Sequence, residues 1–205
     1  MSTKITTLFL DIGGVLLSNG WGQEQRANAV THFKLDADEI NERHHLTFDT
    51  FEQGKLTLDE YLKRVVFYES RTFSVPDFKR FMFQQSIAYQ DTIEFFKKIK
   101  RSYSLSIIAV NNEGQELNQY RIQQFRLFEL FDAFVSSAFV HLRKPDADIF
   151  NMAMNIAHTV PGQSLYIDDR KMFVEVAQSL GMNGIHYQGL AHAKEQLNTF
   201  GLTEK

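Results

Sequence analysis

Short apolar runs recur along the chain and alternate with longer stretches of helical spacing. Apolar runs bounded by turn-forming residues predict buried strands, and a repeating apolar face predicts a helix. Strands are expected at 5–11, 104–110, 133–138, 164–168 and 184–187. Helices are expected at 91–101, 115–126, 146–158, 171–180 and 190–199. Because strands alternate with helices, the pattern predicts an α/β fold with a parallel sheet.

The segment between the first two strands has a different pattern. Residues 23–86 are helical in spacing and contain no convincing strand. Thr57 and Glu60 have the spacing of a capping box, and Leu56 and Tyr61 could form the accompanying hydrophobic staple. The residues that then share one helical face are Leu58, Tyr61, Leu62, Val65 and Val66. This segment therefore predicts a group of helices inserted into the α/β pattern.

The insertion divides the chain into two predicted domains. Residues 1–18 and 89–205 form the core, and residues 19–88 form a small helical cap domain inserted after the first strand. Ligands of open parallel sheets bind beyond the carboxyl ends of the strands. Since the cap begins beside the carboxyl end of the first strand, we expect it to act as a lid.

Composition and charge narrow the class of protein. Of the 205 residues, 43% are apolar and 23% are charged, which is ordinary for a soluble globular protein. A net charge of −3 argues against a general nucleic-acid binder, and the absence of Cys excludes cysteine-ligated zinc. The first apolar run is too short for a membrane span or a signal sequence. We expect a cytoplasmic monomer or homodimer without nucleic-acid or membrane partners.

Polar side chains that could converge on one pocket occur in four short segments. These segments are Asp11, Asn111-Asn112, Lys144-Pro145 and Asp168-Asp169. Three of the four follow predicted strands, and the carboxyl ends of parallel strands lie at one edge of the sheet. Carboxylates that gather there with one lysine could hold a divalent cation and a phosphate.

Each acidic segment has a chemical and a structural interpretation. Asp11 precedes Gly13-Gly14, so its carboxylate could attack phosphorus or carbon as a nucleophile, or it could cap the turn. Asp168 and Asp169 are like charges that a cation would compensate, and magnesium prefers such oxygen ligands. Alternatively, one of the two caps the following helix. The residues alone leave these alternatives open.

The remaining polar and aromatic features are less specific. Lys144 could hold phosphate at the start of a helix that has Pro145 in its first turn, or lie on the surface. Asn111-Asn112 could donate to a phosphoryl oxygen or cap the next helix. His44-His45 is expected to be a surface pair, because adjacent residues do not share a helix face. Trp21 could line the pocket entrance or pack in the core.

Taken together, these residues in this order resemble the haloacid dehalogenase-like hydrolase superfamily, subfamily IA, whose helical cap follows the first strand. The motifs are Leu10-Asp11-Ile12-Gly13-Gly14-Val15-Leu16, Val110-Asn111-Asn112-Glu113, Lys144-Pro145-Asp146-Ala147-Asp148-Ile149-Phe150 and Tyr166-Ile167-Asp168-Asp169-Arg170. The resemblance covers essentially the whole chain. It implies a Rossmann-like core and a Mg²⁺-dependent phosphatase of small phosphorylated metabolites, including sugar phosphates.

The resemblance also implies a role for each motif residue. Asp11 is the expected nucleophile, which becomes phosphorylated, and Lys144 neutralises the phosphate and the nucleophile. The residues expected at the metal are Asp11, Gly13, Asp168 and Asp169. The residues expected to bind the phosphate are Ile12, Gly13, Asn111, Asn112 and Lys144.

Three positions depart from the family pattern. Gly13 stands where phosphatases of the family commonly carry an Asp as general acid and base, a function worth about 10²–10⁴-fold in rate. Asn111 replaces a hydroxyl residue, and Phe173 stands where Asp or Asn often supports the metal. These departures predict a slow or selective phosphatase. The pattern around Asp11 resembles a subgroup that includes phosphatases acting on glucose 1-phosphate, whose anomeric leaving group depends little on protonation.

Two other functions remain as alternatives. A 2-haloacid dehalogenase would also use an Asp nucleophile, but such enzymes usually have an aromatic residue at the position of Gly13. A catalytically impaired binding protein would explain the three departures, although the retained Asp11, Lys144 and acidic pair argue against it.

Overall fold

A five-stranded parallel sheet forms the centre of the fold in the computed structural model, which describes residues 4–204. The first three residues and Lys205, assigned above to the predicted core, lie outside the described part. The strands lie in the order β3-β2-β1-β4-β5. Their bounds are β1 Thr7–Leu10, β2 Ser106–Asn111, β3 Ala133–Ser136, β4 Ser164–Asp168 and β5 Asn183–His186. All five predicted strands are confirmed, most of them shorter than expected.

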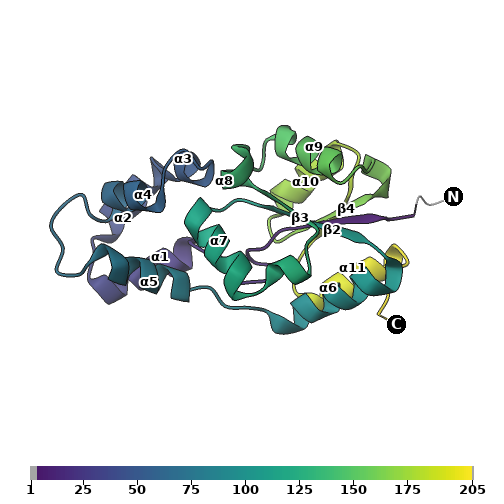
Figure 1. Cartoon of the computed structure of the whole chain (residues 1–205), viewed down its shortest axis with the longest axis horizontal. Helices are drawn as coiled ribbons and strands as arrows, with labels where there is room; N and C mark the ends of the chain where they lie inside the picture. Colours follow the sequence, from purple (N-terminus) through teal and green to yellow (C-terminus); the bar gives the residue numbers. More distant parts are fainter. Residues whose placement is uncertain (1–3, 205) are drawn as a thin grey trace.

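Helices cover both faces of the sheet (Figure 1). They are α6 (Gln90–Tyr103), α7 (Gln115–Gln124), α8 (Ser137–Val140), α9 (Ala147–Ile156), α10 (Lys171–Ser179) and α11 (Leu190–Thr199). Short 3₁₀ turns occur at Leu127–Glu129 and Pro161–Gln163. The five predicted helices of this region are confirmed. Helix α8 was not predicted, because its sequence continues the apolar run of β3.

The two faces of the sheet have separate hydrophobic cores. Successive side chains of a strand point to opposite faces of the sheet. The central strand β1, which lies between β2 and β4, shows this alternation. Leu8 and Leu10 belong to a buried cluster with residues of α6 and α11. Phe9 belongs to a second cluster with residues of α9 and α10. Burial on both faces explains why β1 is a continuous apolar run rather than an alternating one.

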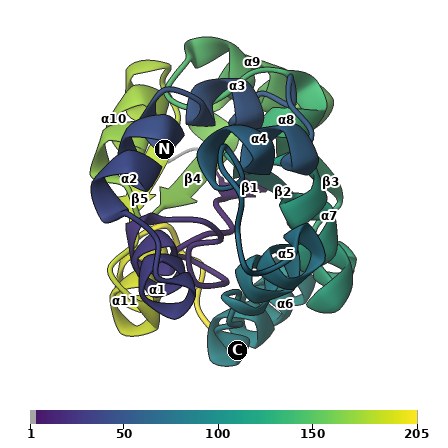
Figure 2. The ribbon, with the colours of Figure 1, turned by 90° about the vertical axis from the view of Figure 1, so that its left-hand side faces the viewer.

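Five helices follow β1 and precede α6, and they lie beyond the carboxyl end of the sheet (Figures 1 and 2). They are α1 (Gln23–Phe33), α2 (Ala37–His45), α3 (Phe48–Glu52), α4 (Leu58–Val65) and α5 (Val75–Gln84), here called the cap helices. The predicted capping box of Thr57 and Glu60 starts α4. The predicted helical face from Leu58 to Val66 is buried, in a third hydrophobic cluster. The helical character of this segment is thus confirmed, while the exact division into two domains stays a prediction.

The cap helices contact the core at several places, two of which involve aromatic and charged side chains. The Phe83 ring stacks on Tyr120 of α7, with the ring centroids 4.8 Å apart. Arg143, which follows α8, forms ion pairs with Asp49 and with Glu52 of α3, at 2.6 and 2.7 Å. The cap helices are therefore held against α7 and against the loop that follows α8.

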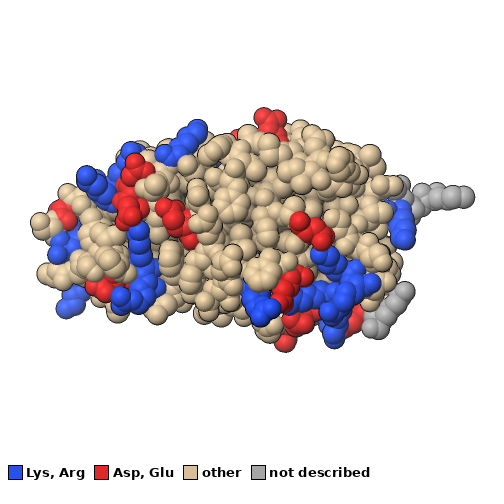
Figure 3. All heavy atoms as spheres, viewed as in Figure 1, with Lys and Arg blue, Asp and Glu red and all other residues tan. Residues whose placement is uncertain are grey.

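Charged side chains on the face shown in Figure 3 lie in two groups of mixed sign. One group covers the cap helices, and the other lies over α6, where Lys97 pairs with Glu129 and Lys100 pairs with Asp132. Such exposed pairs contribute little to stability. Among the residues described, no helix is long and apolar enough to cross a membrane.

Candidate active site

The polar residues at the strand ends converge as predicted. Asp11 directly follows β1, Asn111 ends β2 and Asp168 ends β4, and both β2 and β4 pair with β1. Carboxylate oxygens of Asp11, Asp168 and Asp169 lie within 4.8 Å of one another. The sheet topology therefore brings Asp11 together with two adjacent acids that lie more than 150 positions later in the sequence.

Lys144 lies between two of these carboxylates. Its Nζ is 3.1 Å from Oδ1 of Asp11 and donates a hydrogen bond of 2.7 Å to Oδ2 of Asp168. Burial disfavours the charged amine, but the two carboxylates outweigh it and raise the pKa of Lys144. The ammonium also lies 5.1 Å from the centre of the Phe173 ring, within the range of a cation–π contact. Lys144 is thus a fixed positive charge at the end of the sheet.

Both carboxylate oxygens of Asp168 accept hydrogen bonds from protein groups. Besides Lys144, the hydroxyl of Tyr166 donates to Oδ2, and the backbone N–H of Arg170 donates to Oδ1 at 2.7 Å. Although burial acts in the opposite direction, Lys144, Tyr166 and the Arg170 N–H lower the pKa of Asp168. This carboxylate is ionised and holds Lys144 in place.

Asp11 and Asp169 are less well compensated. Burial, with the nearby charges of Asp168 and Asp169, raises the pKa of Asp11 to about 7, against the effect of Lys144. Burial and Asp168 also raise the pKa of Asp169, whose Oδ1 is buried without a hydrogen-bond partner in the described structure. Oxygen atoms in this state suit a divalent cation, because hard cations take carboxylate ligands. The residues present therefore fit a metal ion.

The loop after Asp11 is shaped around these acids. A Cβ on Gly14 would lie 2.2 Å from Oδ2 of Asp169, and Gly14 has a φ of 72°, which other residues rarely adopt. A Cβ on Gly13 would lie 3.1 Å from Oδ1 of Asn19. Only glycine fits at position 14, because the Asp169 carboxylate lies where a Cβ would be. At position 13 a Cβ would contact only Asn19.

The two asparagines do not cap the following helix. Gly114 is the N-cap residue of α7, and no side chain bonds to that cap. Asn112 instead bonds the backbone of Lys144 twice, donating to its C=O at 2.8 Å and accepting from its N–H at 2.9 Å. Asn111 accepts from the Ser136 hydroxyl at 2.7 Å and donates to another core amide. The capping interpretation of this pair is wrong.

The expectation that Lys144-Pro145 opens the next helix, with Pro145 in its first turn, is also wrong. Helix α9 begins at Ala147 with Asp146 as its N-cap residue, so Pro145 lies before the first turn. Lys144 reaches the acids because Asn112 holds its backbone beside β2, and not because it lies in a helix terminus.

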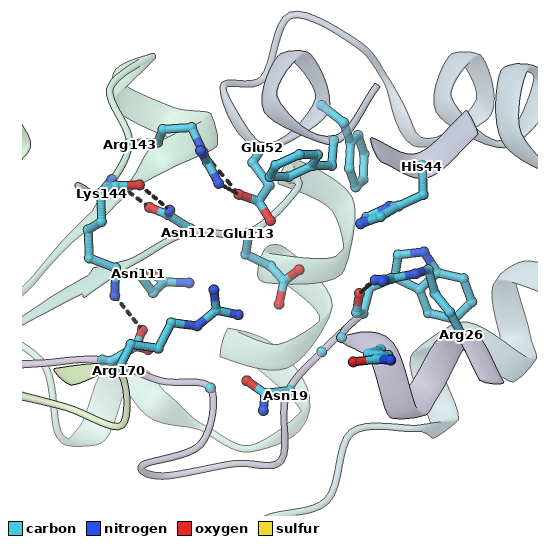
Figure 4. Close-up of a pocket in the computed structure, with 18 of the residues that line it drawn as sticks. Asn19, Arg26, His44, Glu52, Asn111, Asn112, Glu113, Arg143, Lys144 and Arg170 are labelled. Atoms are coloured by element: carbon cyan, nitrogen blue, oxygen red, sulfur yellow. Dashed lines mark hydrogen bonds and ion pairs between the residues drawn. The ribbon is translucent and has the colours of Figure 1, made fainter. Parts of the chain in front are cut away.

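A cavity of about 610 Å³ opens from Asp11 and Lys144 toward the cap helices. Figure 4 shows side chains of the core and of the cap helices directed into it from opposite sides. His44 lines this cavity and its Nδ1 lies 2.7 Å from the Tyr61 hydroxyl, so the prediction of a surface pair is wrong for His44. His45 is exposed, because adjacent residues of a helix face different ways. Trp21 both lines the cavity and packs edge-on against Phe78.

Several cavity residues were not predicted from the sequence. Glu113 and Arg121 form a buried ion pair of 2.5 Å, and burial raises the pKa of Glu113 although Arg121 opposes it. Arg26, Arg143 and Arg170 also line the cavity. Among these residues, the sequence signals were the position of Glu113 directly after Asn112 in the second motif and that of Arg170 directly after Asp169 in the fourth.

Comparison with known proteins identifies the family. Residues 33–186 match the family profile described as haloacid dehalogenase-like hydrolase. A D-ribitol-5-phosphate phosphatase of Bacteroides thetaiotaomicron is 23% identical over a 218-residue alignment that covers 94% of this chain and 97% of that protein. A phosphorylated carbohydrates phosphatase of Thermotoga maritima is 26% identical over 139 residues, which cover 68% of this chain and 59% of that protein.

A solved structure shares the fold. It is a HAD family enzyme of Bacteroides thetaiotaomicron in complex with magnesium and inorganic phosphate, with a TM-score of 0.77 and 19% identity. The superposition covers 92% of this chain and 98% of that one. Because the family profile spans most of the sequence and the fold agrees with it, the chain belongs to the haloacid dehalogenase-like hydrolase family.

Proposed function

We propose that this hydrolase is a Mg²⁺-dependent phosphatase of phosphorylated polyols or sugars that acts through an aspartyl-phosphate on Asp11. The observation that carries the proposal is the fixed Lys144 beside Asp11, next to an Asp169 oxygen that has no protein partner in the described structure. The two relatives named above, which act on D-ribitol 5-phosphate and on phosphorylated carbohydrates, support this substrate class.

The proposed reaction has two displacement steps at phosphorus. A carboxylate oxygen of Asp11 attacks the phosphorus, a P–O bond forms, and the bond to the leaving alcohol breaks. Water then attacks the aspartyl-phosphate, which releases inorganic phosphate and restores the carboxylate. In both steps Lys144 faces the negative charge of the phosphoryl group, which it stabilises as a point charge.

The metal would be held by Asp11, Asp169 and the Gly13 carbonyl, and it would neutralise phosphoryl charge as a Lewis acid. We assign Asp168 to holding Lys144 rather than to direct metal binding, because its oxygens already accept hydrogen bonds from three protein groups. For the phosphate we retain the loop from Ile12 to Gly13 and the residues Asn111, Asn112 and Lys144. The segment 19–88 would act as the cap over this site.

The lack of an acid at Gly13 makes the rate depend on the leaving group. A good leaving group departs without a proton, whereas an ordinary alcohol needs one. We therefore expect turnover of activated or anomeric phosphates to exceed that of alkyl phosphates. A dehalogenase would use Asp11 without a cation, and the metal-ready pair of Asp11 and Asp169 favours the phosphatase.

The test is phosphate release from a panel of polyol, sugar and aryl phosphates with Mg²⁺ and with EDTA. Asp11→Asn should abolish turnover, while the exposed cap substitution Asp38→Asn should leave it unchanged. Chloride or fluoride release from 2-haloacids is measured in parallel. Activity that persists in Asp11→Asn, or halide release without phosphate release, would overturn the proposal.

A further inference from the structure

The wall of the cavity formed by the cap helices contains a chain of hydrogen bonds that ends at His44. The indole N–H of Trp21 donates to the Tyr61 hydroxyl at 2.9 Å, and that hydroxyl lies 2.7 Å from Nδ1 of His44. Tyr61 is fully buried, and its hydroxyl has only these two partners within the described residues. Because an indole N–H can only donate, Nδ1 of His44 is the acceptor that the described residues offer to the buried hydroxyl proton, and we assign the tautomer accordingly.

This chain fixes the protonation of the imidazole. Burial, with the nearby Arg26 and His45, lowers the pKa of His44 to about 3, so the ring is neutral. Its Nδ1 accepts from Tyr61, and a neutral imidazole carries its one proton on the other nitrogen. His44 therefore offers an Nε2–H donor. Figure 4 shows the ring directed into the cavity, on the side opposite Lys144.

Arg26 provides a second donor on the same wall. Its Nη1 donates to the Trp21 carbonyl at 2.9 Å, and its Nε donates to Asn41 at 3.3 Å. The guanidinium is partly buried and, among the residues described, forms no ion pair. The acids nearest to it in the cavity, Glu52 and Glu113, are already paired with other arginines. These two hydrogen bonds use two of the five N–H groups of the guanidinium. The other three have no acceptor among the described residues.

We propose that Arg26 and His44 together bind a hydrogen-bond-accepting oxygen of the leaving group and are specificity-determining residues of this enzyme. The site lies across the cavity from Lys144, whose Nζ is 3.1 Å from Asp11, so its ligand is the part of the substrate remote from the phosphate. A hydroxyl of a polyol or a terminal carboxylate has the required acceptor. The inference rests on the proposed function, whose test above is independent of these two residues.

The experiment compares two substrates and two substitutions. The long substrate is D-ribitol 5-phosphate, and the truncated substrate is 2-hydroxyethyl phosphate, which lacks the remote oxygens. Arg26→Met and His44→Phe should each lower kcat/KM on the long substrate about 10- to 100-fold, mainly through KM, since each removes a buried hydrogen bond. On the truncated substrate the loss should stay below about twofold.

Conservative and control variants separate binding from folding. His44→Gln keeps an acceptor for Tyr61 and a donor for the substrate, so it should recover much of the loss. Arg64→Met removes an equal charge from an exposed position of α4 and should change neither substrate. A third substrate carries a carboxylate in place of the remote hydroxyl. If it is hydrolysed equally well or better, the result supports the same donor site and identifies an anionic oxygen as its ligand.

Three outcomes would overturn the inference. Equal losses on the long and truncated substrates would show that the residues act through the fold or the chemistry. No loss on either, or a wild-type kcat/KM that is no higher for the long substrate, would show that nothing binds there. A wild-type protein that releases phosphate from no substrate, p-nitrophenyl phosphate included, would overturn the proposed function instead, and this inference with it.

Discussion

The substitution Gly13→Asp tests whether the missing general acid limits this enzyme. Gly13 does not have a positive φ, so its backbone accepts a side chain without strain. A Cβ there would lie 3.1 Å from Oδ1 of Asn19 and 3.7 Å from its Cα. The first contact is short by a few tenths of an ångström, and Asn19 is exposed and able to turn away. We therefore expect Gly13→Asp to fold.

The expected gain follows from the value of a positioned acid. General acid catalysis contributes about 10²–10⁴-fold, which corresponds to about 3–5 kcal/mol of activation free energy. Displacing Asn19 costs about 1 kcal/mol if the contact behaves as mild overpacking. A gain of at least about tenfold should therefore appear on alkyl phosphates. On p-nitrophenyl phosphate, whose leaving group needs no proton, the rate should change little.

The assay is kcat/KM for a series of alkyl and aryl phosphates as a function of leaving-group pKa. Gly13→Asn is the matched control, because it adds nearly the same volume without an ionisable group. A second pair in an Asn19→Ala background removes the close contact. If Asp and Asn at position 13 act alike, or if the alkyl-to-aryl ratio does not change, the proton already comes from another group and the reasoning fails.

Three further predictions follow from buried or capping groups. Lys144→Met should lower the free energy of unfolding by about 3–5 kcal/mol in urea titrations, because it leaves two buried carboxylates unpaired. The pKa of His44 is lowered from 6.5 to about 3 in the folded protein, so below pH 6.5 the unfolded chain binds a proton that the folded protein does not. The stability present above pH 6.5 is therefore lost as the pH falls toward 3. In His44→Gln the decline of unfolding free energy between pH 7 and 4 should be smaller by about 1–2 kcal/mol, allowing for partial exposure. Thr57→Ala removes the capping box with Glu60 and should lower the free energy of unfolding by about 1 kcal/mol in thermal unfolding, with kcat unchanged. A change in kcat would show that α4 acts on the site.

The sequence predicted the sheet well because its strands are buried on both faces. A strand such as β1 then contains an unbroken apolar run, Leu8 to Leu10, instead of the spaced apolar positions of a helix. The errors lie at the ends. Ile5 is buried but lies outside the ladder, and Ser137–Val140 continues the apolar pattern of β3 while forming a helical turn. Hydrophobicity indicates burial there, but the hydrogen bonds decide where the element stops.

The acids were predictable and the cavity wall was not, for one physical reason. Asp11 and Asp168 are located by the sheet, since neighbouring parallel strands end at the same edge. Arg26 and His44 belong to helices whose placement depends on docking between distant segments. Their spacing in the sequence matches no motif, and the usual preference of His and Arg for the surface suggests the wrong environment.

The loop that carries Lys144 contacts both Asp11 and the cap helices. Lys144 contacts Asp11, and the residue before it, Arg143, pairs with Asp49 and Glu52 of the cap. A shift of this loop would therefore move Lys144 and the contact between Arg143 and the cap helices together. Because Asn112 bonds the same backbone, the loop is fixed to the carboxyl end of β2. The sheet edge thus sets the positions of Asp11 and Lys144 and, through Arg143, of the contact with α3.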